Sequence, residues 1–245
     1  MFINKITPKN YVISLGGGCD IKLFLINKYF PNQKTEFFDY LWNFDKGLHY
    51  VSKILEESFN GFSSIGDYQY IIPKKFDSSL TKTIPKNKIS LQDQTKDVYY
   101  FVPKKYPEII FLHYNNPKKF IVSFKKKIKR IKKLLVNNKI TFVYYRQFDE
   151  PINSIYINNL DYDIDNKIKF WINETEDFYN RFLINNKKDR LISLFALPHD
   201  YIKSNLELPK NKTNLFFDYI FYKGLPNNDH TKVNSEMNRI YSKYF

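Results

Sequence analysis

The chain has 245 residues, of which 43% are hydrophobic and 18% aromatic. This composition is typical of a globular protein and excludes an intrinsically disordered one. The longest apolar runs are too short to span a membrane, and the amino terminus lacks the apolar stretch of a secretory signal peptide. We therefore expect a cytoplasmic protein, and the single cysteine agrees with a reducing compartment.

The formal net charge of +14 favours an acidic partner such as nucleic acid or a membrane surface. Lys, Asn, Ile, Tyr and Phe crowd the sequence, however, and Ala196 is its only alanine. An AT-rich genome produces the same lysine excess regardless of function. The charge by itself therefore leaves the partner open.

The most informative stretch begins with an apolar strand at Tyr11–Leu15 and continues through Gly16, Gly17 and Gly18 to Cys19, where an apolar helix begins. Glycines allow a tight turn and a close approach of ligand to backbone. Free amide groups and the dipole at a helix start stabilise a thiolate. These residues indicate a cysteine nucleophile at Cys19, with Gly17 and Gly18 binding an anion or oxyanion.

Two other interpretations of this turn stay open. One is a structural glycine turn with an inert, buried cysteine. The other is a phosphate-binding loop, although a dinucleotide fingerprint would need its third glycine at Ile21. A nucleophilic cysteine needs a histidine elsewhere in the chain.

Asp39 lies in an aromatic segment, Glu36–Trp42. It either caps a helix predicted at about 46–59 or is a buried acid that orients a catalytic base. Strands predicted at 68–72 and 98–102 then flank a polar segment, which indicates a hairpin-like excursion around 66–103.

His113 ends an apolar strand that begins at about Glu108, and Asn115 follows it. The carboxyl ends of strands in open α/β sheets are where ligands bind. Of the four histidines, His113 is therefore the best placed to act as a base.

A helix is predicted at 117–136, because apolar residues recur at three- and four-residue spacing. Its other faces are predicted to carry Arg130 and several lysines, including Lys127, and the helix contains no acidic residue. They form either a solvated face or a surface for an anionic partner, through Lys125, Lys126, Lys129, Arg130 and Lys133.

The remaining pattern alternates strands (139–146, 190–197, 214–222) with helices (166–184, 233–244). The carboxyl end of the first of these strands carries Arg146 and Asp149 as further polar candidates. This alternation predicts an α/β fold with a largely parallel sheet flanked by helices, in a single domain over 1–245. No motif points to a cofactor or a metal, and we expect none.

Several elements together resemble the putative papain-like cysteine peptidase family (DUF1796). They are Ser14-Leu15-Gly16-x-x-Cys19, Phe38-Asp39-Tyr40, Phe59-x-x-Phe62, the strand ending in His113, and the basic helix leading to Phe142-Val143. The resemblance covers about residues 11–146. It departs at Tyr40, where the family usually has tryptophan.

The resemblance implies Cys19 as nucleophile and His113 as its base, with papain-like α+β as the alternative fold. We therefore expect a cysteine-dependent hydrolase of peptide or glycan-linked acyl groups, with Asp39, or failing that Asp149, orienting the imidazole. Amide groups at Gly18 and Cys19 would complete an oxyanion hole.

Two alternative functions remain. The first is a glycan- or nucleotide-sugar-modifying enzyme that holds phosphate at Gly16–Gly18. The second is a non-enzymatic binder of an anionic polymer through the basic helix at 117–136.

Overall fold

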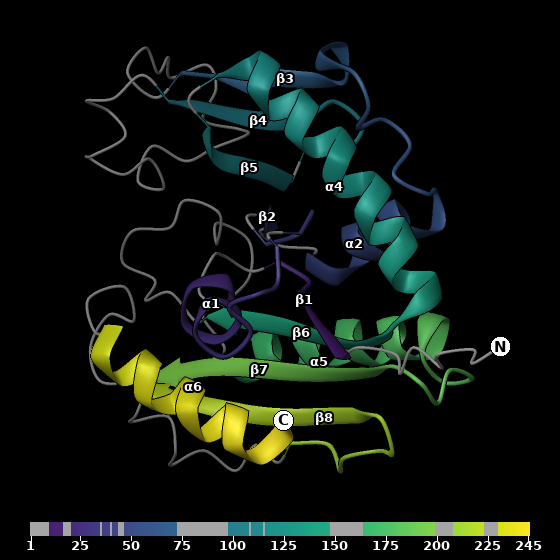
Figure 1. Cartoon of the computed structure of the whole chain (residues 1–245). Coiled ribbons are helices and arrows are strands. Elements are labelled where there is room, and N and C mark those ends of the chain that lie inside the picture. The colour runs from purple at the N-terminus through teal and green to yellow at the C-terminus, as the bar shows by residue number, and fades with distance from the viewer. Residues whose placement is uncertain are drawn as a thin grey trace, which may run out of the picture.

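The structure is a computed structural model, and it describes residues 10–16, 21–34, 36–39, 41–43, 47–72, 98–107, 109–114, 116–147, 164–198, 208–222 and 230–245. The strands within these ranges form two four-stranded sheets, one parallel and one antiparallel. The long helix α4 (Pro117–Asn137) extends from the antiparallel sheet to the parallel sheet along one side of the molecule (Figure 1).

The parallel sheet consists of β1 (Asn10–Ser14), β6 (Lys139–Gln147), β7 (Arg190–Pro198) and β8 (Leu215–Tyr222). Its spatial order is the order of the chain. The strands are nearly continuous apolar runs, as expected where helices cover both faces of a parallel sheet.

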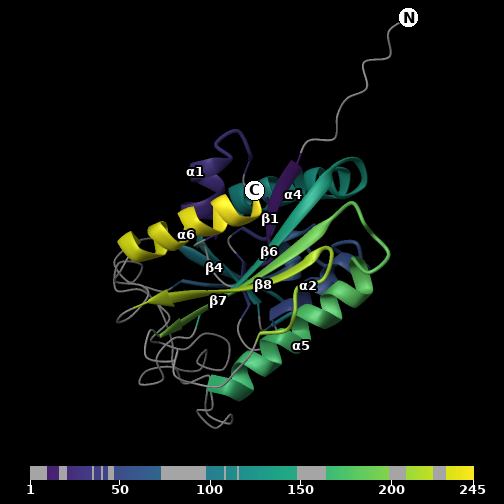
Figure 2. The ribbon, with the colours of Figure 1, turned by 90° about the horizontal axis from the view of Figure 1, so that it is seen from below.

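Helices lie on both faces of this sheet. The π-helix η1 (Ile21–Ile26) and α6 (His230–Tyr244) pack on one face, next to the short α1 (Asn27–Tyr29). The other face carries α5 (Ile164–Phe182) and α2 (Gly47–Glu56) (Figure 2).

Successive residues of β6 alternate between these two faces. Val143 and Tyr145 belong to the apolar cluster of η1 and α6, whereas Phe142 and Tyr144 belong to the larger cluster that includes α5. This is the alternation of side chains that any β-strand produces. Both sets are apolar because both faces are covered.

The antiparallel sheet has the order β2 (Leu41–Asn43), β5 (Ile109–Tyr114), β4 (Tyr99–Pro103) and β3 (Tyr68–Ile71). A 3-10 helix, η2 (Ile65–Asp67), leads into β3. All of these elements lie between β1 and β6 in the chain. The antiparallel sheet is thus an insertion after the first parallel strand.

Helix α4 covers the antiparallel sheet with aromatic side chains. Phe120 stacks on Phe101 of β4, with ring centroids 3.8 Å apart, and Phe124 meets the edge of Phe111 of β5 at 4.6 Å. The helix begins where the sequence predicts, because the Asn116 side chain accepts a hydrogen bond from the amide of Lys119 and Pro117 occupies the first turn.

The predicted α/β class, with a parallel sheet flanked by helices, is confirmed. The strand that carries His113 lies in the antiparallel sheet, however, and does not end at the ligand-binding edge of the parallel one. The three-residue strand β2 has no counterpart in the prediction, because so short a segment gives no periodicity. No helix in the described part of the chain is both long and apolar enough to cross a membrane.

Candidate functional site

Several predicted site residues lie outside the described residues: Gly17, Gly18, Cys19, Asn115 and Asp149. The backbone of His113 is part of β5, but its side chain is not described. Asp39 and Arg146 are described in full. The segments that flank the glycine turn and those around His113 are also described, and they define the surroundings of the candidate site.

The described residues on either side of the glycine stretch form the predicted strand before it and a helix after it. After β1 ends at Ser14, the amide of Leu15 donates to the Val143 carbonyl at 2.9 Å. Gly16 then has a φ of +95°, a left-handed conformation that favours glycine, and η1 begins at Ile21. Cys19 itself lies outside the described residues, in the stretch of sequence between this strand and this helix.

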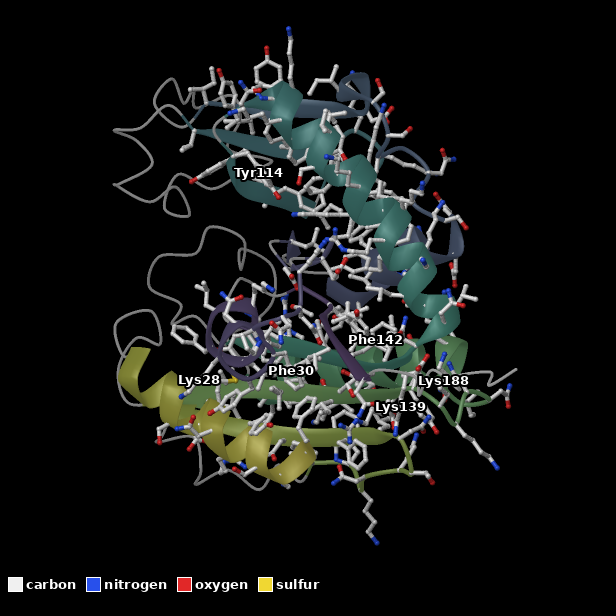
Figure 3. The ribbon with its side chains drawn as sticks, in the orientation of Figure 1. Lys28, Phe30, Tyr114, Lys139, Phe142 and Lys188 are labelled. Atoms are coloured by element: carbon white, nitrogen blue, oxygen red, sulfur yellow. The ribbon has the colours of Figure 1, made fainter. Side chains whose placement is uncertain are left out.

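A β-bulge occurs in β5 at the predicted catalytic histidine. Tyr114 pairs with Tyr99 and Phe111 with Phe101, so that two residues of β5, Leu112 and His113, stand against a single residue of β4. Bulges of this kind redirect side chains and are frequent next to active sites. Figure 3 shows the adjacent residue, Tyr114, on the antiparallel sheet.

The register between β2 and β5 relates Asp39 to His113. Leu41 pairs with Phe111, and each further residue along β2 pairs with the preceding residue of β5. Asp39 precedes Leu41 by two residues, and His113 follows Phe111 by two. The amide of Leu41 donates to the Phe38 carbonyl at 3.1 Å, so Asp39 lies in a turn. Asp39 and His113 both fall just beyond the Leu41–Phe111 pair, at the same end of this ladder.

Asp39 is a buried carboxylate with two unequal oxygens. Its Oδ2 accepts a hydrogen bond from the Glu36 amide at 2.7 Å and lies 3.7 Å from the Lys22 ammonium. No hydrogen-bond donor among the described residues reaches Oδ1, although this atom is buried. Asp39 therefore caps no described amide of the following helix, and one of its oxygens is available to a further donor.

Asp39 belongs to a group of ionisable side chains, of which four are buried and Arg130 is half-buried. We call it the charged cluster: Lys22, Glu36, Asp39, Lys127 and Arg130. Arg130 of α4 donates from Nε to Glu36 at 2.7 Å. Lys127 of α4 donates from Nζ to the Tyr114 hydroxyl at 3.3 Å. The cluster thus joins η1, the turn at 36–39, α4 and the end of β5.

Burial dominates the ionisation of this cluster. It raises the pKa of Asp39, while Lys22, the Glu36 amide and Lys127 oppose the rise. It likewise raises the pKa of Glu36 against the effect of Arg130. Burial lowers the pKa of Lys127 to about 8, although Asp39 and Glu36 favour its charged form.

Arg146 lies in a second buried network, at the carboxyl end of β6. Its guanidinium is 5.4 Å from the ring centre of Trp171. Glu174 of α5 accepts a hydrogen bond from the Tyr144 hydroxyl at 3.0 Å and one from the His49 amide, in the first turn of α2, at 3.4 Å. A carboxylate there complements the positive end of the helix dipole. This network holds α2 against the parallel sheet.

For two residues of the charged cluster the structure differs from the sequence prediction: Lys127 is buried, and Lys22, which the prediction does not include, belongs to the site. Lys127 was predicted on the solvated faces of its helix but is buried. Its spacing from Phe124 and Ile131, three and four residues, puts it on the apolar stripe and could have revealed this. Lys22 interrupts the apolar run Ile21–Ile26, which is the corresponding signal in η1.

The outer face of α4 keeps only part of its predicted basic surface. Lys125, Lys126, Lys129 and Lys133 are exposed. Arg130, however, is paired with Glu36, which neutralises its charge. Among the residues that the structure describes, no group of three or more His, Cys, Asp or Glu side chains has the arrangement of a metal site.

Comparison with known proteins gives one family. The model of the family described as "Putative papain-like cysteine peptidase (DUF1796)" matches residues 10–168, about two thirds of the chain. The matched range runs from β1 through the antiparallel sheet and α4 into the start of α5, and so includes the glycine turn, Asp39 and His113. No curated protein and no solved structure matches the chain.

Proposed function

The chain belongs to the family described as putative papain-like cysteine peptidases (DUF1796), and on this basis we propose that it is a hydrolase in which Cys19 is the nucleophile, His113 the general base and Asp39 the acid that orients the imidazole. The family description supports the general class of hydrolase. The assignment of the three residues is our own inference from the sequence motifs and from the surroundings of Asp39. The family match does not favour the nucleotide-sugar alternative.

The observation that carries the proposal is that Asp39 and His113 both lie just beyond the Leu41–Phe111 pair, at the same end of the β2–β5 ladder. Asp39 lies in the turn before β2, and its Oδ1 is a buried acceptor that no donor among the described residues occupies. A buried carboxylate oxygen without a donor costs about 1–3 kcal/mol or more. An imidazole N–H donor from His113 would remove that cost.

In the proposed reaction, His113 takes the proton from the Cys19 thiol, and the thiolate sulfur attacks the carbonyl carbon of the substrate. The resulting oxyanion accepts hydrogen bonds from amides of the turn at Gly17, Gly18 and Cys19. The imidazolium then protonates the leaving amine or alcohol, which leaves an acyl thioester on Cys19. Water, deprotonated by His113, hydrolyses the thioester and regenerates the thiol.

Asp39 would act through His113 rather than on the substrate. A carboxylate that accepts from one ring nitrogen fixes the imidazole tautomer, so that the other nitrogen can accept the thiol proton. The substrate class that we propose is a peptide or a glycan-linked acyl group, because both offer a carbonyl carbon to a thiolate.

The test is the pH dependence of iodoacetamide alkylation. Since the chain has a single cysteine, the reaction reports on Cys19 alone. We expect the wild-type thiol to titrate well below the ordinary value of about 8.5, and to return toward that value in His113→Ala. His49→Ala is the matched control, because His49 is exposed on α2 and should leave the profile unchanged.

An ordinary thiol that is indifferent to His113 would remove the proposal. A positive result would be followed by hydrolysis assays with peptide and acyl-glycan substrates. There Cys19→Ala should abolish turnover while preserving the unfolding transition.

We also propose that the exposed lysines of α4 bind an anionic partner. Lys125, Lys126, Lys129 and Lys133 share the outer side of a helix that contains no acidic residue. Binding through them would be predominantly electrostatic and sensitive to salt.

A further inference from the structure

We infer that Lys22 is a positioning residue: its buried ammonium fixes one oxygen of Asp39, so that the other oxygen stays available as the acceptor for the proposed catalytic imidazole. The inference rests on the proposed function, since it concerns how the acid of that site is held. It assigns a role to a side chain that neither the sequence motifs nor the family description identifies.

The contact between the two side chains is direct and buried. Lys22 Nζ lies 3.7 Å from Asp39 Oδ2, and the side chains are 3% and 1% exposed. The same Oδ2 accepts the amide of Glu36 at 2.7 Å. With two partners on one oxygen, the carboxylate plane is fixed, and Oδ1 remains as the acceptor without a donor among the described residues.

Stability alone does not explain a buried lysine at this position. Taking two charges out of water costs several kcal/mol for each ion, and an apolar pair of similar volume is often as stable or more so. The flanking residues Ile21, Leu25 and Ile26 are fully apolar and buried. A methionine would complete that face, so the ammonium points to a function of the charge.

Lys22 also connects the two parts of the proposed site. It is the second residue of η1 and follows Cys19 by three positions. Asp39 lies in the turn before β2, the strand that pairs with the His113-bearing β5. The ion pair therefore links the segment that carries the nucleophile to the segment that carries the acid. Single π-helical turns are frequent at functional sites.

Other charged groups face Asp39 but hold it less directly. Lys127 of α4 donates to the Tyr114 hydroxyl of β5 at 3.3 Å and acts on Asp39 through its charge. Arg130 of α4 pairs with Glu36, whose own charge repels that of Asp39. Among the described cations, Lys22 is the one in ion-pair contact with Asp39.

The experiment compares Lys22→Met and Lys22→Arg with wild type by two readouts, the pH profile of Cys19 alkylation and the imidazole pKa of His113 from NMR titration. Without the ammonium, Asp39 loses its anchor and stabilises the imidazolium less. We expect Lys22→Met to lower the pKa of His113 and to slow alkylation at mildly acidic pH by roughly tenfold, the equivalent of about one pKa unit. Lys22→Arg should keep both the pKa of His113 and the alkylation rate close to the wild-type values.

The matched control is Lys243→Met. It removes a lysine that pairs with another aspartate, Asp218, at 2.8 Å on α6 and β8. It should reproduce the wild-type alkylation profile and His113 titration, even where it lowers thermal stability. If this control shifts the alkylation profile and the His113 titration by the same amount, the effect reflects a general loss of stability, and the inference is overturned.

If Lys22→Met does not fold, the carboxyl-carbon NMR titration of Asp39 in wild-type protein takes its place, with Asp39→Asn to assign the signal. A carboxylate ionised at neutral pH supports the inference, and a protonated one overturns it. The two proposals fail differently. A low thiol pKa that depends on His113 but not on Lys22 overturns the role of Lys22 alone, whereas an ordinary thiol in wild type removes both.

Discussion

The Lys22 ammonium and the Asp39 carboxylate form an ion pair, 3.7 Å from Nζ to Oδ2, in which both side chains are almost completely buried. The two residues are seventeen positions apart and lie on different elements, η1 and the turn before β2. This pair joins η1 to the turn that carries the candidate acid, just before the antiparallel sheet.

We expect Lys22→Met to lower the free energy of unfolding by about 3 kcal/mol, because it leaves a buried carboxylate without its counterion. Lys22→Met combined with Asp39→Asn should cost less than the sum of the two single changes, since the neutral amide no longer needs the counterion. Urea unfolding of wild type, the two single variants and the double variant gives the coupling free energy between the two side chains. The exposed pair Lys105–Glu57 is the matched control, and its coupling should be small. Equal couplings in both pairs would contradict the prediction.

Lys127 should make stability depend on alkaline pH. Its pKa is about 8 in the folded protein, lowered by burial, against 10.5 for an ordinary lysine. Between these two values the unfolded state binds more protons than the folded state, so the free energy of unfolding should rise with pH through this window, by up to about 1.4 kcal/mol per pH unit from this group. Lys127→Met should remove the rise. Lys129→Met, an exposed neighbour on α4, should keep it. A flat wild-type curve over that window would refute this assignment.

Asp218 should make the protein sensitive to acid. Burial raises the pKa of Asp218, but hydrogen bonds from Lys243, Arg239 and Tyr244 outweigh that effect and leave it below the ordinary value. Its contribution to stability is therefore fully present above the unfolded pKa of about 3.9, and is lost as pH falls through the lower folded value.

We expect Asp218→Asn to lower the free energy of unfolding at neutral pH by about 1–2 kcal/mol. It should also reduce the further loss of stability as the pH falls into the acid range. Asp177→Asn, on the exposed side of α5, is the control. Thermal unfolding followed from neutral pH to about pH 3 measures both. If Asp218→Asn loses stability with falling pH as steeply as wild type does, other carboxylates are responsible for the acid sensitivity.

The exposed lysines of α4 should determine retention on heparin, used as a polyanionic probe. Replacing Lys125, Lys126, Lys129 and Lys133 with glutamine should lower the salt concentration at elution markedly, because a surface with fewer ammonium groups displaces fewer counterions from the polyanion. The control replaces four exposed lysines elsewhere, Lys34, Lys104, Lys169 and Lys187, with the same change in net charge. If the two quadruple variants elute together, retention reflects net charge and not this surface.

The prediction from the sequence was most accurate where a single segment carries its own signal. The apolar stripe of Phe120, Phe124 and Ile131 predicted α4 almost to the residue. The prediction was incomplete where a feature depends on a partner. The bulge at Leu112 and His113 exists only because β5 pairs with β4, and β2 is a strand only because it pairs with β5.

Local sequence was sufficient for the strand and Gly16 before Cys19, for the helix after it, and for the alternation of strands and helices that follows. These features depend on conformational preference and periodicity. Three features emerge only in the folded chain. The His113 strand belongs to an antiparallel sheet, Asp39 is buried with one oxygen toward Lys22, and Lys127 and Arg130 turn inward while their neighbours remain exposed. The cause is physical. Strand pairing and the burial of charge depend on which distant segment supplies the hydrogen bond or the counterion, and no local pattern in the chain specifies that segment.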